Sequence, residues 1–264
     1  MAEKMQKKAS PYPQVTLIGV SGIPLIKKSD DLGRIICKCA QEQGTPIAEG
    51  DVVVVEQKVV SKAENRVVSL SKVKPSEFAI EAARKAEKEP EVVELALREA
   101  KSIIRMRNGI LITRTRHGFI CANSGVDKSN VSGERNVTLL PIDPDASARR
   151  IRERIRKVTG KKVVVIVSDT FGRPFREGHT NVCIGLSGLR PILDLRGKQD
   201  LFGYELKVKQ IAIADELSSA AELLAGNASE AIPVVIVRGY SRYASSEEGR
   251  ALELVRPEER DIFL

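Results

Sequence analysis

The sequence contains no tryptophan, two histidines (His117 and His179) and four cysteines, and aromatic residues make up only 4% of its 264 positions. The cysteines form no Cys-x-x-Cys pair, so a zinc site with the usual cysteine and histidine spacing is not expected. The shortage of aromatic side chains disfavours a surface on which nucleic-acid bases stack. Any bound metal would therefore be a hard cation held by oxygen ligands.

Long apolar runs and two common nucleotide-binding motifs are also absent. The longest apolar run, residues 163–167, has five residues, whereas a membrane-spanning helix needs about 18 or more. Residues 1–14 carry lysines but no apolar segment of a secretory signal, so we expect a flexible arm and a cytoplasmic protein with reduced thiols. The chain has neither Gly-x-x-x-x-Gly-Lys-Ser/Thr nor Gly-x-Gly-x-x-Gly, which excludes the P-loop and the Rossmann turn as nucleotide sites.

The composition indicates a folded protein with an anionic partner. Hydrophobic residues account for 42% of the chain, which is enough for a sizeable core. The 43 Lys and Arg residues outnumber the 35 Asp and Glu residues, which gives a formal charge of +8. Such an excess of positive charge suits nucleic acid, or a small molecule with phosphates and carboxylates.

Apolar patterning predicts a mixture of strands and helices. Strands are expected at 15–20, 52–55, 110–115, 118–122, 163–167, 206–214 and 233–237. Helices are expected after Asp31, over most of 75–104 with a break at Pro90, at 143–160, and at 215–225. Because helices do not alternate strictly with strands, we expect an α+β or irregular α/β fold.

Three polar segments after β-prone runs carry groups suited to phosphate or metal. Residues 123–130 include Asp127 and Asn130, and residues 60–66 include Lys62. Residues 168–178 are expected to form a loop that carries Asp169, Thr170, Arg173 and Arg176. Asp and Thr oxygens suit Mg²⁺ or Mn²⁺, and arginines offer forked donors to phosphate or carboxylate. Each segment taken alone also fits an ordinary surface turn.

Two further features have simpler explanations. Residues 149–157 are strongly basic and would suit a nucleic-acid-binding helix. Their apolar stripe favours a packed helix with a solvated basic face instead. His179 and Cys183 are four positions apart but lack an evident orienting partner, so we assign them to packing or to the surroundings of a substrate.

In combination, these segments resemble the coenzyme F420-0:L-glutamate ligases, also called F420:γ-glutamyl ligases. The resemblance extends from about Val15 to Gly239, and the order and density of its segments make it specific. The matching segments are 22–26, 61–66, 123–127 with Asn130, 140–145, 168–173, 196–203, 214–217 and 232–239.

The resemblance implies an enzyme that uses GTP to add L-glutamate to coenzyme F420-0 through an acyl phosphate, giving F420-1. A second, γ-linked glutamate would give F420-2. It also implies Mg²⁺ or Mn²⁺, two per site, with K⁺ as a further cation. The implied fold is α+β and particular to the family, with mixed sheets and flanking helices, in an intertwined homodimer. Residues 15–264 would form a single ligase unit, or two intertwined subdomains, without a C-terminal reductase domain.

The resemblance also assigns site residues, none of them a nucleophile. The implied metal ligands are Asp127, Asp169, Thr170 and Asn227, the last at a position where some members have an acidic residue. The implied GTP contacts are Ile23, Pro24, Leu25, Ile26, Gln57, Lys58, Lys62, Asn130, Leu224, Ala225, Gly226, Asn227, Ala228, Ser229, Glu230 and Ala231. Arg173 and Arg176 are candidate phosphate or substrate contacts.

The sequence alone leaves two other functions open. One is a related metal-dependent enzyme that forms amides or transfers phosphoryl groups with another acceptor. The other is a basic nucleic-acid-binding protein that uses the 149–157 segment. Carboxylates at strand ends favour an enzyme, because they repel phosphate unless a metal intervenes. The partners we expect are GTP, F420-0, L-glutamate and a second copy of the chain, without a specific nucleic acid or a membrane.

Overall fold

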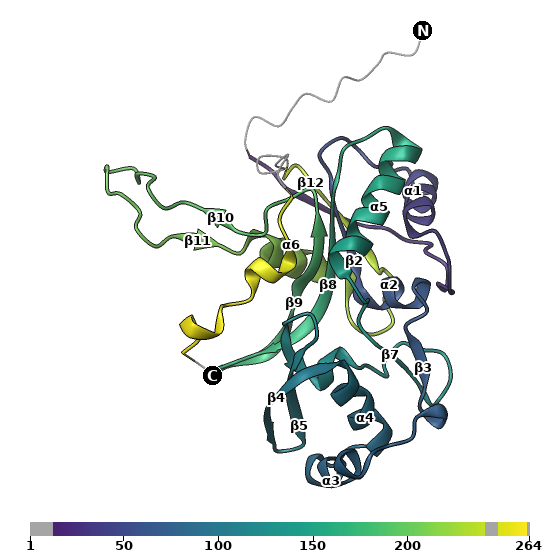
Figure 1. Ribbon diagram of the computed structural model, residues 1–264. Helices are drawn as coiled ribbons and strands as arrows, with labels where there is room; N and C mark the ends of the chain where they lie inside the picture. Colours follow the sequence, from purple (N-terminus) through teal and green to yellow (C-terminus); the bar gives the residue numbers. More distant parts are fainter. Residues whose placement is uncertain (1–12, 241–247, 263–264) are drawn as a thin grey trace.

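The computed structural model describes residues 13–240 and 248–262 (Figure 1). The predicted flexible arm, residues 1–14, therefore lies outside the described residues except for its last two. Several sheets and helices form a mixed architecture, which confirms the α+β prediction. Within the described ranges, no helix has both the length and the apolar character needed to cross a lipid bilayer.

A five-stranded sheet forms the centre of the molecule. Its strands, in spatial order, are β1 (Thr16–Gly19), β12 (Val234–Arg238), β2 (Val52–Glu56), β8 (Val164–Arg173) and β9 (Arg176–Ser187). Strands β2 and β8 are parallel, and the other neighbours are antiparallel. The valines and isoleucines of β2, β12 and the first half of β8 are buried, which explains why their apolar runs are uninterrupted rather than alternating.

In the part of the chain that the structure describes, four α-helices accompany this sheet. Helix α1 (Leu32–Glu42) packs on α5 (Pro144–Thr159), which packs on β8 and β9, whereas α6 (Ile213–Ala225) packs on β9, β12 and β1. The short helix α2 (Gln57–Ala63) follows β2 without a break. Because both faces of the central strands are covered, polar groups are admitted only at the strand ends.

Residues between α2 and α5 form a second lobe with its own core, at the bottom of Figure 1. Leu70, Val93, Leu111 and Val137 belong to a buried cluster separate from that of the main sheet. The lobe's elements are β3 (Val67–Ser69), α3 (Glu77–Ala86), α4 (Pro90–Glu99), β4 (Ala100–Arg107), β5 (Ile110–Thr115), β6 (Ile120–Ala122) and β7 (Asn136–Thr138). Strands β4, β5 and β6 form one antiparallel sheet, and β3 pairs with β7.

Helix starts and ends follow capping chemistry visible in the sequence. The side chains of Asp31, Ser76 and Asp143 accept backbone hydrogen bonds at the first turns of α1, α3 and α5. Pro144 occupies the first turn of α5, and Gly160 ends that helix in the left-handed conformation. Short 3₁₀ turns lie at Leu70–Lys72, Asn123–Gly125, Ala251–Leu254 and Glu258–Arg260.

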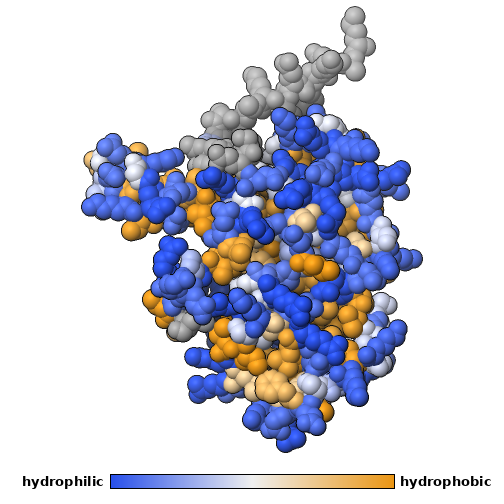
Figure 2. Space-filling model, viewed as in Figure 1, coloured by the Kyte–Doolittle hydropathy of each residue, from blue (hydrophilic) through white to orange (hydrophobic). Residues whose placement is uncertain are grey.

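An arm projects from the main body on the left of Figure 1. It contains the antiparallel pair β10 (Leu193–Asp194) and β11 (Gln210–Ile211) and the chain between them. The face shown in Figure 2 is mostly hydrophilic, with apolar patches that include the base of this arm. Leu201 and Phe202 on the arm are 98% and 96% exposed, so the arm presents apolar side chains to its surroundings.

Three predictions of secondary structure are wrong. The predicted helix up to Ile104 ends at Glu99, because the chain enters the edge strand β4, which pairs with β5. The predicted strand at 206–214 is reduced to β11, since α6 begins at Ile213. The predicted loop at 168–178 is instead a hairpin, in which β8 continues to Arg173 and pairs with β9. Its polar residues suggested a loop because the ribbon extends beyond the apolar core.

Candidate functional site

A cleft of about 550 Å³ lies where β2 and β8 emerge from the core beside α2, the 127–130 loop and residues 225–233. It brings together every residue that the sequence predicted for metal or GTP except Leu224. Its lining residues are Ile23, Pro24, Leu25, Ile26, Glu56, Gln57, Lys58, Val59, Lys62, Asp127, Ser129, Asn130, Asp169, Thr170, His179 and residues 225–233. Segments far apart in the sequence therefore form one site.

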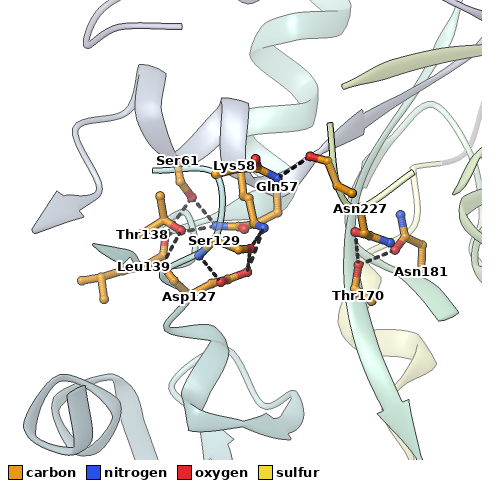
Figure 3. Close-up of polar contacts among 12 residues, drawn as sticks. Gln57, Lys58, Ser61, Asp127, Ser129, Thr138, Leu139, Thr170, Asn181 and Asn227 are labelled. Carbon is orange, nitrogen blue, oxygen red and sulfur yellow. Dashed lines mark hydrogen bonds and ion pairs between the residues drawn. The ribbon is translucent and has the colours of Figure 1, made fainter. Parts of the chain in front are cut away.

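Asp127 is fixed as a carboxylate on one side of the cleft. Its Oδ2 lies 2.9 Å from Lys58 Nζ, and its Oδ1 accepts a 2.7 Å hydrogen bond from the Ser129 backbone N–H (Figure 3). Burial acts to raise the pKa of Asp127, but the Ser129 hydrogen bond and Lys58 outweigh it and lower the pKa. Asp127 is thus ionised at neutral pH and available to a cation.

The amines of α2 hold the neighbouring loops in place. Lys62 Nζ donates a 2.7 Å hydrogen bond to the backbone oxygen of Asn130, whose Nδ2 donates to the backbone oxygen of Ala228 at 3.2 Å. Partial burial and the nearby Lys58 lower the pKa of Lys62. Two amines that repel each other at one end of a cleft favour an anionic ligand there.

Gln57 has a structural role that its sequence position did not reveal. Its side chain is buried and donates to Ser61 Oγ at 2.6 Å and to the backbone oxygen of Leu139 at 3.2 Å (Figure 3). Ser61 Oγ donates to the same Leu139 oxygen at 2.7 Å. These bonds tie α2 to the chain that returns from the second lobe, so a contact between Gln57 and GTP would involve its backbone.

Asp169 and Glu56 concentrate negative charge deeper in the cleft. Burial, and then the charge of Asp127, raise the pKa of Asp169 to about 7. Burial, followed by the charges of Asp169 and Glu222, raises the pKa of Glu56 to about 8. Carboxyl groups that hold protons to such a high pH lack compensating positive charge, so a bound cation would stabilise their ionised forms.

Thr170 lies in a hydrogen-bonded network that joins β8, β9, β2, α6 and the segment after α6. Its Oγ1 is 2.7 Å from Asn181 Oδ1 and 3.1 Å from Asn227 Oδ1 (Figure 3). Asn181 Nδ2 donates to Glu56 Oε1 at 2.8 Å, and its backbone N–H donates to Glu222 Oε2 at 2.9 Å. Asn227 Nδ2 also donates to Glu222. The orientation of the Asn227 amide is therefore set by Thr170 and Glu222, with its oxygen toward Thr170.

Sequence reasoning missed Glu56, Asn181 and Glu222. Glu56 directly follows the buried Val52–Val55 run, just as Asp169 comes soon after Val163–Val167. This similarity in position was the sequence signal that could have identified Glu56 as a site residue. Asn181 is brought to the site because it pairs with Thr170 across the hairpin. Glu222 is brought to the site because α6 packs on β9. Neither of these two has a local sequence signal.

The donor atoms of the cleft fit a hard divalent cation. Asp127, Asp169, Thr170 and Asn227 all line it, and they offer carboxylate, hydroxyl and amide oxygens, the ligand types that Mg²⁺ and Mn²⁺ take. Across residues 13–240 and 248–262, no three His, Cys, Asp or Glu side chains are grouped to hold a metal. A cation at this cleft would therefore depend on the neutral oxygens, and on ligand atoms brought by the substrate.

The other candidate residues have different positions relative to the cleft. Arg173 and Arg176 lie at the end of the β8–β9 hairpin and are not part of the lining. His179 lines the cleft, but it pairs with Gly172 while Cys183 pairs with Ser168. Burial raises the pKa of the Cys183 thiol well above its usual value, with Asp215 and Asp145 adding to the shift. Cys183 is a packing residue, as predicted, rather than half of a dyad.

The basic face of α5 is largely neutralised within the protein. Arg152 Nη1 lies 3.0 Å from Glu248 Oε1, Arg154 Nε lies 2.7 Å from Asp31 Oδ2, and Arg150 pairs with Glu64. Arginines engaged with carboxylates in this way have less charge to offer to nucleic-acid phosphates. The helix is packed by its apolar stripe, as its periodicity indicates.

Known proteins match this chain over most of its length. Residues 22–239 match the family described as F420-0:Gamma-glutamyl ligase. A coenzyme F420:L-glutamate ligase of Methanothermobacter thermautotrophicus is 43% identical over 94% of this chain and 98% of its own. Its counterpart in Methanocaldococcus jannaschii is 48% identical over 83% of this chain and 86% of its own. The counterpart in Methanosarcina barkeri is 38% identical over 93% of each chain. This chain therefore belongs to the F420-0:gamma-glutamyl ligase family.

Proposed function

We propose that the protein adds L-glutamate to coenzyme F420-0, using GTP, to give F420-1 and then F420-2 in coenzyme F420 biosynthesis. Family membership and the names of its relatives support the ligase reaction. The observation that carries the proposal is the cleft, in which two lysines and several carboxylates from distant segments line the same cavity. In a reaction between anionic substrates, lysines would contact the phosphates, and carboxylates would hold the cations that reduce the repulsion.

GTP would occupy the end of the cleft lined by the 23–26 loop, α2 and the 225–231 loop. Lys58 and Lys62 would place positive charge at its phosphates, and Asn130, which bonds to Ala228, would hold the two walls together. Most residues of the 225–231 loop are alanine, glycine or serine, whose small side chains let a ligand approach the backbone. This arrangement binds a nucleotide without the P-loop or the Rossmann turn that the sequence lacks.

The chemistry follows from the poor reactivity of a carboxylate toward an amine. Transfer of the γ-phosphoryl group of GTP to the F420-0 carboxylate would release GDP and form an acyl phosphate. The glutamate amine would then attack the carbonyl carbon, phosphate would leave, and the amine would lose a proton as the amide forms. Mg²⁺ or Mn²⁺, two per site and with K⁺ as a further cation, would be held by Asp127, Asp169, Thr170 and Asn227 and would neutralise the phosphate charge. No residue acts as a nucleophile.

The proposal is tested by incubating the protein with F420-0, L-glutamate, GTP and Mn²⁺ and measuring the products by mass spectrometry. We expect masses that correspond to one and then two added glutamyl units, with GDP and phosphate as by-products. Parallel reactions without GTP, and with ATP in its place, test the nucleotide. An unchanged F420-0 mass in the complete mixture would refute the ligase reaction.

Replacing Lys62 with alanine is expected to raise the KM for GTP about tenfold or more and to lower kcat by a smaller factor. A point charge on the phosphates contributes to binding in both the ground state and the transition state, so its loss appears mainly in KM. Steady-state kinetics with varied GTP measures the effect. Lys101→Ala, which removes an exposed lysine of β4, serves as the control, and an unchanged KM in Lys62→Ala would remove this lysine from the nucleotide site.

We also propose a homodimer held by the projecting arm. A two-stranded ribbon of this kind is marginally stable alone, and exposed apolar side chains such as Leu201 and Phe202 mark contact surfaces. Light scattering of the wild-type protein should give the mass of two chains, and the double variant Leu201→Glu/Phe202→Glu should give that of one. Lys198→Glu, on the same exposed arm, is the control. A wild-type monomer with full activity would contradict the dimer.

A further inference from the structure

The β8–β9 hairpin extends beyond the cleft and presents two arginines at its end. Asp169, Phe171 and Arg173 occupy alternate positions of β8, and the register with β9 shifts between Gly172 and Arg173. Arg173 is paired directly with Arg176 of β9, and Pro174 and Phe175 form the turn between them. A continuous strand therefore connects the acidic part of the cleft to this arginine pair.

Within residues 13–240 and 248–262, no carboxylate forms an ion pair that would compensate the positive charge of these two arginines. Like charges directly opposite each other on neighbouring strands are destabilising. Among the residues that the structure describes, neither arginine forms an ion pair, and the single hydrogen bond of the Arg173 side chain runs from Nη2 to the Glu177 backbone oxygen at 2.8 Å. Arg173 Nε is buried and lacks a partner within the same ranges. An anion between the two guanidinium groups would satisfy the buried donor and relieve the repulsion.

The position of the pair indicates which substrate carries that anion. The proposed GTP site is formed by α2 and the 225–231 loop, whereas the arginines lie outside the cleft lining, beyond Asp169. At a rise of about 3.4 Å per residue, Arg173 lies roughly 14 Å along the strand from Asp169. Even with the reach of an arginine side chain, a fully extended L-glutamate only just covers this span, so a longer substrate is better suited to place one anion at the pair and a reacting carboxyl group beside Asp169. The coenzyme acceptor is the remaining substrate.

We propose that Arg173 and Arg176 bind an oxyanion, a phosphate or a carboxylate, of the coenzyme acceptor at a point remote from its reacting carboxyl group. The inference rests on the proposed ligase function. It assigns the acceptor to the hairpin side of the cleft and the nucleotide to the α2 side. The two arginines position the acceptor, and the forked guanidinium geometry suits an oxyanion better than an amine would.

The test measures each substrate separately in Arg173→Ala and Arg176→Ala. We expect the KM for F420-0, and its dissociation constant measured calorimetrically without GTP, to rise about tenfold or more in each variant. The KM values for GTP and L-glutamate should stay within about twofold of wild type. Arg173→Lys, which keeps the charge without the fork, should recover part of the F420-0 affinity. Arg107→Ala, on an exposed position of β4, is the matched control.

The possible failures are distinguishable. A rise in the KM for GTP or for L-glutamate, with F420-0 unaffected, would assign the pair to that substrate and overturn the inference while the ligase function stands. Arg176→Ala replaces an exposed residue, so its result does not depend on whether Arg173→Ala folds. If Arg176→Ala left the KM values of all three substrates and the F420-0 dissociation constant unchanged, the inference would also be overturned. A wild-type protein that neither binds nor extends F420-0 would overturn the proposed function itself.

Discussion

Replacing Asp169 or Asp127 with asparagine is expected to lower turnover by 100-fold or more. Each change removes a negative ligand from the cation that the cleft is proposed to hold, and that cation offsets repulsion between the nucleotide and the acceptor carboxylate. Metal assistance contributes several kcal/mol to such a transition state, and about 1.4 kcal/mol corresponds to a factor of ten in rate. The loss should exceed that caused by Lys62→Ala, which acts mainly on GTP binding.

The measurement is kcat at a series of Mn²⁺ concentrations with GTP and F420-0 saturating. Raised Mn²⁺ should partly restore the aspartate variants and leave Lys62→Ala unchanged, because only the aspartates hold the cation. Glu134→Gln, an exposed carboxylate outside the cleft, should behave as wild type. Near wild-type turnover of both aspartate variants at limiting Mn²⁺ would show that the proposed metal site is wrong.

Replacing Arg238 with alanine is expected to destabilise the protein by about 3 kcal/mol. Arg238 donates from Nε and Nη2 to the two carboxylate oxygens of Asp51, at 2.9 and 2.7 Å, and Asp51 is 1% exposed. Without the guanidinium, this buried carboxylate would keep only the hydrogen bond from the Ala48 backbone N–H. Breaking a buried pair typically costs about 3–5 kcal/mol, and the lower figure applies because the Arg238 side chain is 34% exposed.

Urea unfolding monitored by circular dichroism gives the free energy of unfolding for this comparison. Arg238→Lys should lose less stability, since it keeps the charge but not the forked contact. Arg84→Ala breaks an exposed pair with Glu81 and should change stability by about 1 kcal/mol or less. An equally small loss in Arg238→Ala would mean that Asp51 does not depend on its partner.

The strands of the central sheet were predictable because their burial is visible in the sequence as uninterrupted apolar runs. Val52–Val55 and Val163–Val167 are short runs that are apolar at consecutive positions, as is typical of strands covered on both faces. The hairpin beyond Val167 was not predictable in this way. Its residues from Asp169 to Thr180 lie at the margin of the core or outside it, so β-pairing, and not a run of buried apolar side chains, determines their conformation.

The candidate site was predictable where its residues belong to segments typical of the family. Asp127, Asp169 and Lys62 were found in this manner, and the fold brings them to one cavity. Glu56, Asn181 and Glu222 were not found, because their roles arise from tertiary neighbours. Asn181, for example, is buried between Thr170, Glu56 and Glu222, and none of these lies within ten residues of it in the sequence.

The order of strands in the central sheet has a consequence for biosynthesis. Among the strands that the structure describes, β1 pairs only with β12, and β12 lies between β1 and β2. A ribosome that adds about 5–20 residues per second needs roughly 10 to 40 s to travel from the first of these strands to the last. Throughout that interval the N-terminal strand has no partner, and the edge of β2 that β12 will cover stays open. The nascent chain therefore exposes unpaired strand edges until β12 has been made, and the 23–26 wall of the cleft is completed only after that point.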